Sequence, residues 1–70
     1  MGVSYKKLWK ILIDKEMSRA DLRRAIKLAP NTLTKLNQDQ PVNMLILCRI
    51  CEELNCDFSD IVEYKRELKE

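Results

Sequence analysis

The 70-residue sequence predicts a compact all-α fold of five helices, and three observations lead to this prediction. One glycine and two prolines leave few residues for the many turns of a β fold. Apolar residues recur at helical spacing along most of the chain. The stretch Ser18–Leu36 has the pattern of two short helices joined by a tight turn. We therefore expect one domain over residues 1–70, with its core in residues 5–62 and a charged C-terminal extension over 63–70.

The first helix is predicted to begin at a Ser4 cap and to end near Lys15. Its apolar stripe consists of Tyr5, Leu8, Ile11 and Leu12, with Trp9 and Ile13 at the margin. We interpret Trp9 as a residue lying across the edge of the core, because the chain has too few aromatic residues for a stacking platform. Residues 1–3 are expected to be loose.

The second and third helices have clear local signals. Ser18 can cap the second helix, and Asp21 can return a hydrogen bond to the Ser18 amide, as in a capping box. The apolar face of that helix is predicted to contain Leu22, Ala25 and Ile26. The pattern breaks at residues 27–29, and Pro30 suits the first position of a new helix. Leu33 and Leu36 form the inner edge of this third helix.

Two further helices follow a polar loop at residues 37–41. Asn43 can cap the fourth helix, and Asn55 can end it in the left-handed conformation. Its inner face consists of Leu47, Ile50, Cys51 and Leu54. Asp57 can cap a short fifth helix that turns Phe58, Ile61 and Val62 inward. The charged segment Tyr64–Glu70 is expected to be either frayed or part of a partner surface.

Charge is unevenly distributed along the chain. Residues 1–37 hold nine Lys or Arg against three Asp or Glu, a net charge of +6. Residues 38–70 hold four against eight, a net charge of −4. This asymmetry indicates either a polyanionic partner on one side or ordinary solvated helix faces, and charge alone does not separate the two.

The residue content argues against catalysis and metal binding. No histidine is present for acid–base chemistry or for completing a zinc site with the cysteines, and no glycine-rich phosphate loop is found. We expect Cys48, Cys51 and Cys56 to serve in packing. Three cysteines, no signal peptide and no apolar run of membrane length lead us to expect a cytoplasmic protein. No catalytic residue, metal or cofactor is predicted.

The pattern as a whole resembles the Cro/CI-type, lambda-repressor-like helix-turn-helix family of transcriptional regulators. The residues that carry the resemblance are Ser18, Leu22, Leu28, Thr32, Leu33, Lys35 and Leu36 in the motif, and Leu8, Ile11, Val42, Ile50, Leu54, Cys56 and Ile61 outside it. It covers residues 5–62, with the helix-turn-helix at the second and third helices. Three positions depart from the family pattern: Lys27 replaces a glycine, Ala29 a polar cap and Arg19 a glutamine.

The resemblance implies that the helix Pro30–Asn37 enters the major groove of DNA. Asn31 could then bind adenine, Lys35 could donate to guanine, and Thr32 could offer its methyl group to thymine. The resemblance also places Arg19 against a phosphate. The remaining predicted phosphate contacts are Ser18, Thr34, Asn37, Gln38 and Gln40.

The function expected from this reasoning is sequence-specific transcriptional regulation. The partners would be double-stranded DNA and, weakly, a second copy of the chain, with dimerisation favoured on DNA; no membrane and no small-molecule ligand are expected. The alternative is a protein-interaction or antitoxin-type module on the same fold with weak or no DNA readout. The atypical Lys27, Ala29 and Arg19 motivate that alternative.

Overall fold

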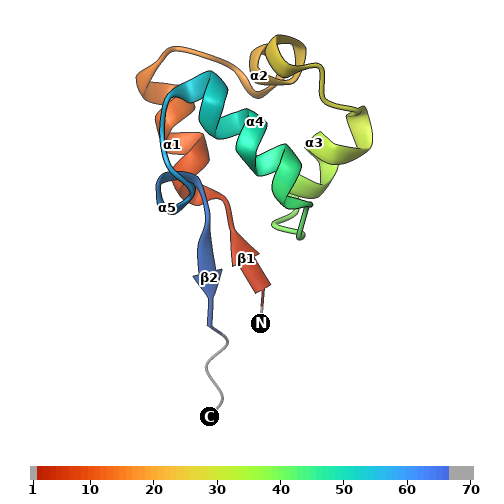
Figure 1. Ribbon diagram of the computed structural model, residues 1–70, viewed down its shortest axis with the longest axis vertical. Helices are drawn as coiled ribbons and strands as arrows, with labels where there is room; N and C mark the ends of the chain where they lie inside the picture. The colour runs from red at the N-terminus through yellow and green to blue at the C-terminus, as the bar shows by residue number, and fades with distance from the viewer. Residues whose placement is uncertain (1, 67–70) are drawn as a thin grey trace.

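A computed structural model describes residues 2–66 of the chain. It confirms the five predicted helices and adds two short strands at the ends of the described region (Figure 1). The elements in chain order are β1 (Gly2–Ser4), α1 (Lys6–Asp14), α2 (Arg19–Ile26), α3 (Pro30–Asn37), α4 (Met44–Leu54), α5 (Phe58–Ile61) and β2 (Glu63–Lys65). No helix within residues 2–66 is long and apolar enough to cross a membrane.

Every helix contributes a fully buried side chain to one core. These side chains are Leu8, Leu22, Leu36, Ile50 and Ile61, one from each helix in order. The predicted inner faces of α1, α4 and α5 are confirmed in outline, because their remaining apolar residues are buried or packed against this core.

Two residues predicted to face inward do not. Ile13 is 72% exposed, and Ala25 is also exposed. Ile13 directly follows the buried Leu12, so a 100° step around α1 turns it away from the core. Leu22 and Ile26 alone bury the inner face of α2.

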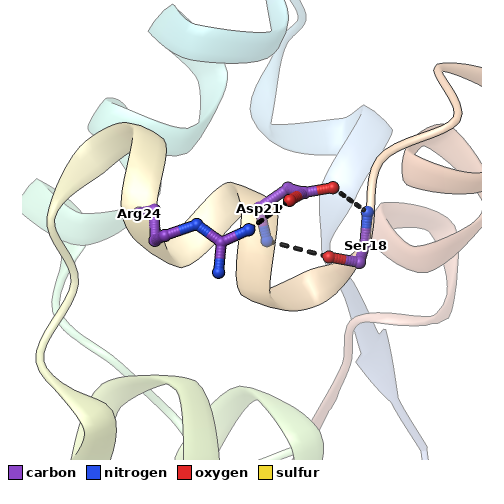
Figure 2. A network of polar contacts seen from close by, with 3 residues as sticks. All are labelled: Ser18, Asp21 and Arg24. Atoms are coloured by element: carbon purple, nitrogen blue, oxygen red, sulfur yellow. Dashed lines mark hydrogen bonds and ion pairs between the residues drawn. The ribbon is translucent and has the colours of Figure 1, made fainter.

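Hydrogen bonds at the helix starts confirm the predicted caps Ser18 and Asn43. The Asp21 amide donates to Ser18 Oγ and the Ser18 amide donates to Asp21 Oδ2, both at 2.9 Å, which completes the capping box shown in Figure 2. Asn43 Oδ1 accepts from the amide of Ile46 at 3.0 Å. Asp57 occupies the cap position of α5 as predicted, but its side chain makes no cap hydrogen bond; instead its amide donates to Asp60 Oδ2 at 2.9 Å. Helix α1 begins later than predicted, because Ser4 belongs to β1 and Tyr5 occupies the cap position.

Two helices end at residues in the left-handed conformation, and the sequence predicts this for Asn55. Asn55 after α4 has φ 54° and Lys27 after α2 has φ 56°. The Leu28 amide donates to the Arg23 carbonyl at 2.9 Å, which closes the turn around Lys27. A lysine thus occupies the position where the resemblance leads us to expect glycine.

Replacing Lys27 by glycine is expected to stabilise the protein. Glycine relieves the steric cost of the left-handed conformation but loses more entropy on folding, so we expect a net gain of about 0.5–1 kcal/mol in the free energy of unfolding. Denaturant unfolding would measure it. The control is Lys10→Gly within α1, which should lose about 1 kcal/mol because glycine is a poor helix former. Destabilisation by Lys27→Gly would contradict the prediction.

The termini correct the expectation of loose and frayed ends. Strands β1 and β2 pair antiparallel, with Gly2 opposite Lys65 and Ser4 opposite Glu63. Val62 is extended, with φ −139° and ψ 146°, and leads the chain from α5 into β2. The sequence pattern does not predict this pairing, because a strand of three residues is too short to show an alternation of apolar and polar residues. The rest of the segments expected to be loose, Met1 and Glu67–Glu70, lies outside the described residues.

Candidate nucleic-acid interface

The predicted helix-turn-helix is formed by α2, the turn at residues 27–29 and α3. Leu36 anchors α3 in the core, and Leu33 is half-buried beside it. Pro30 is the first residue of α3, and the cap residue Ala29 makes no side-chain cap hydrogen bond. In Figure 1, α3 lies at one side of the molecule, away from α1 and α5. Its outer face is therefore free to meet a partner.

The three residues predicted to read bases lie near one another on α3. Asn31 and Lys35 are exposed and four residues apart, so they lie one helical turn apart on the same side. Thr32 is half-buried next to Asn31. Asn31 belongs to the first turn, which is the part of a recognition helix that approaches base edges.

Two of the predicted phosphate contacts meet each other. The Arg19 Nη1 group donates to Asn37 Oδ1 at 2.7 Å, and the guanidinium carbon lies 3.8 Å from the centroid of the Trp9 ring. Arg19 is the first residue of α2 and Asn37 the last of α3. Nearby, the Ser18 hydroxyl oxygen accepts the Asp21 amide, which leaves the hydroxyl proton available to a phosphate.

The other three predicted phosphate contacts differ in what they can donate. Thr34 Oγ1 donates to the Pro30 carbonyl at 3.1 Å, so its hydroxyl proton is used within α3. Gln40 Nε2 donates to Gln38 Oε1 at 3.0 Å, which leaves the amide group of Gln38 free to donate. Gln38 and Gln40 are thus the better placed donors of this group.

The loop that holds these glutamines is anchored by Tyr5, a role that sequence reasoning missed. The Tyr5 amide donates to Asp39 Oδ1 at 3.1 Å, and the Tyr5 hydroxyl donates to the Gln40 carbonyl at 2.8 Å. Burial raises the pKa of the Tyr5 phenol, so it stays a neutral donor at physiological pH. Asp39 adopts φ 55°, and an aspartate between polar residues was the only available signal for such a turn.

A second anchor, also missed, comes from α4. The guanidinium group of Arg49 donates to the carbonyl of Ile26, the last residue of α2. A cation at this end satisfies a free carbonyl and complements the helix dipole. Arg49 therefore fixes the end of α2 just before the turn into α3.

The motif surface is positively charged. Residues 18–37 hold five Lys or Arg and one Asp, a net charge of +4. The single acid, Asp21, pairs with Arg24 (Figure 2), and the Ser18 backbone and side-chain hydrogen bonds are the main cause of its lowered pKa. Arg19, Lys27 and Lys35 are exposed on the same motif. Such a surface is suited to a polyanion.

The cysteines lie apart from this surface. Cys51 and Cys56 are half-buried and pack against the core, whereas Cys48 is exposed on α4. Within residues 2–66 no three side chains of the metal-binding types gather into a possible metal site.

Thiol alkylation should separate Cys51 from Cys48. Burial is the main cause that raises the pKa of Cys51 to about 11, so at pH 7–8 its thiol is almost wholly protonated and unreactive in the folded protein. Iodoacetamide with mass spectrometry should label Cys48 first, and Cys51 labelling should rise as the pH approaches 11. Because the folded state holds this proton more tightly than the unfolded state, stability should also fall as the pH rises through that range. Equal labelling rates at pH 7.5 would contradict the prediction.

Fold and surface together define a helix-turn-helix DNA-binding domain. Residues 7–67 match the model of the Cro/C1-type HTH DNA-binding domain, and the chain belongs to that family. It is also similar to a solved structure, the crystal structure of the transcriptional regulator VanUg in form II, with 47% sequence identity and a TM-score of 0.92. The match covers 94% of this chain and 88% of that chain. No curated protein matches the sequence.

Proposed function

We propose that the protein is a sequence-specific transcriptional regulator that places α3 in the major groove of DNA. Asn31, Thr32 and Lys35 contact bases. Phosphate contacts come from Ser18, Arg19, Asn37, Gln38 and Gln40, with Thr34 contributing only if its hydroxyl leaves the Pro30 carbonyl. The similarity to the regulator VanUg supports the regulatory role. We propose neither catalysis nor a small-molecule ligand for the chain.

The observation that carries the proposal is the exposed polar face of α3 on a motif packed against the core. Leu36 and Leu22 bury the inner side of the two helices, and Arg49 holds the end of α2. Asn31 and Lys35 are therefore presented by a helix whose position is set by the core. Precise placement is what base readout requires, since bidentate hydrogen bonds tolerate little displacement.

The departures from the family pattern do not disturb this motif. Lys27 takes the left-handed conformation that a glycine would take, and α3 begins at Pro30 without a polar cap at Ala29. Arg19 lies at the start of α2, where a cation can approach a phosphate. The rival proposal, an interaction module without DNA readout, thus loses much of its motivation.

Selection of bound sites from random duplex DNA tests the proposal. A recurring motif, followed by a mobility shift that scrambled DNA does not reproduce, would support it; recovery of no preferred sequence would contradict it. Titrating the selected DNA with protein in the same mobility-shift assay gives the number of chains bound per site.

We propose a weak homodimer favoured on DNA, because one recognition helix reads too few base pairs to single out a site. The exposed apolar residues Met44 and Leu45 on α4, and Tyr64 on β2, are candidates for that contact.

Two alanine variants should separate base readers from phosphate contacts. Asn31→Ala is expected to weaken the selected site by about 1–3 kcal/mol and to relax preference at one base pair. Arg19→Ala should weaken all sequences alike, because phosphates carry no base identity. Competition binding against operators with single base-pair changes would measure both. If Asn31→Ala weakens binding to all operators equally, Asn31 does not read a base.

A further inference from the structure

Three helices bring one side chain each to a single point on the motif surface. Trp9 comes from α1, Arg19 from the start of α2 and Asn37 from the end of α3. The Arg19 guanidinium carbon lies 3.8 Å from the centroid of the Trp9 ring, and its Nη1 group donates to Asn37 Oδ1 at 2.7 Å. The indole is half-buried and packs against the core, so it provides a fixed base for the arginine.

We infer that these residues form a preassembled clamp for one DNA phosphodiester, an inference that rests on the function proposed above. Arg19 and Asn37 bind the phosphate. Trp9 does not touch it; Trp9 is a positioning residue that holds the guanidinium group of Arg19 in the orientation for binding.

The donors of the clamp fit a phosphate. A guanidinium group has five N–H donors in one plane, and stacking on Trp9 covers a face of that plane without using the donors. Only one donor group is directed at Asn37. Because Asn37 accepts through Oδ1, both N–H donors of its amide nitrogen stay free. The two side chains can thus donate together to the oxygens of one phosphate.

Arg19 differs from Arg24, the other exposed arginine of α2, in having no carboxylate partner within residues 2–66. Arg24 is paired with Asp21. Across residues 2–66, no carboxylate lies within ion-pair distance of Arg19, whose polar partner is the neutral Asn37. The Arg19 charge is therefore available to an anion. Since the stack and the hydrogen bond already order the long side chain, less conformational entropy is lost when a phosphate binds.

A double-mutant cycle on DNA affinity tests the clamp. Arg19→Ala should weaken binding about tenfold or more and lower the slope of log K against log salt by about 0.9 for each clamped phosphate. Trp9→Leu should weaken binding about 2- to 5-fold, the range of an exposed cation–π contact. In the Arg19→Ala background, Trp9→Leu should have no further effect. Arg24→Ala is the matched control, and its effect should simply add to that of Trp9→Leu.

A measurement without DNA tests the geometry separately. Trp9 is the only tryptophan in the sequence, so its fluorescence reports on this site alone. Arg19→Ala should increase the quenching of Trp9 by acrylamide, because the covering guanidinium is lost, whereas Arg24→Ala should not. Thermal unfolding of each variant is recorded first. If Trp9→Leu is not folded at the assay temperature, the cycle is run with Trp9→Met, which keeps apolar volume but removes the aromatic face.

The outcomes separate this inference from the proposed function. Additive effects of Trp9→Leu and Arg19→Ala, in a protein that still selects its DNA site, would overturn the clamp and leave the function intact. Unchanged quenching in Arg19→Ala would also overturn it. The wild-type protein could instead bind no DNA while the quenching of Trp9 shows that Arg19 still covers the indole. That result would overturn the proposed function, and the role of the clamp with it.

Discussion

We expect DNA affinity to fall by about 10³–10⁵ between about 50 and 200 mM salt, if a dimer makes about 6–10 phosphate contacts. The physical reason is counterion release: each phosphate that the protein neutralises frees condensed cations, and added salt opposes their release. Because residues 18–37 carry a net charge of +4, we expect the phosphate contacts that cause this salt dependence to lie on the helix-turn-helix. Fluorescence anisotropy of a labelled duplex, titrated at several KCl concentrations, would measure the slope.

A lysine elsewhere on the surface provides the control. Lys10 is exposed on α1 and lines a groove between α1 and α5 together with Leu54 and Asp60. Lys10→Ala removes the same charge as a motif variant would, so it should leave the slope unchanged. A flat salt response of the wild-type protein would contradict DNA binding through this surface, and a reduced slope in Lys10→Ala would show that the groove also faces the phosphates.

The largest expected effect on stability is that of Leu36→Ala. Leu36 is 0% exposed and attaches α3 to the core. Truncating a buried leucine costs about 2–5 kcal/mol, through lost burial and the cavity that is left. A chain of this size has a total stability of only about 4–10 kcal/mol. Leu36→Ala should therefore unfold at much lower urea concentration, and its DNA affinity should fall because α3 loses its support.

Leu45→Ala is the matched control for this cavity. Leu45 is 67% exposed on α4, so the same truncation should change the free energy of unfolding by no more than about 0.5 kcal/mol. Urea unfolding followed by circular dichroism would measure both variants in dilute solution. Similar midpoints for the two variants would show that Leu36 is not buried as described.

The local features of the fold were predictable from short stretches of sequence. The capping box of Ser18 and Asp21, the Asn43 cap and the left-handed end at Asn55 involve residues only a few positions apart. The main core positions follow from helical periodicity for the same reason. A cap or a buried face depends on which residues neighbour each other along one helix, and the sequence states that directly.

The start of α1 was less predictable from such signals. Ser4 has the residue type of a cap, and its hydroxyl oxygen does accept the Lys6 amide at 3.3 Å. Its backbone, however, pairs with Glu63 in the two-stranded sheet. A contact made across nearly the whole chain decided where the helix begins.

The candidate site was only partly predictable. Asn31 and Lys35 follow from their places on α3, and their roles on DNA stay predictions. That Arg19 stacks on Trp9 and bonds to Asn37, that Tyr5 holds the loop at Asp39 and Gln40, and that Arg49 reaches Ile26 were all beyond sequence reasoning.

These contacts join residues that are far apart in the chain. The hydrogen bond of Arg19 to Asn37 spans 18 positions, that of Arg49 to Ile26 spans 23, and those of Tyr5 to the loop span 34 and 35. The sequence alone determined five helices, most of their ends and an exposed polar face on α3, because these depend on neighbours within a turn or two. Only the tertiary structure decided which side chains support that face, because such pairings depend on how the helices pack and not on any spacing along the chain.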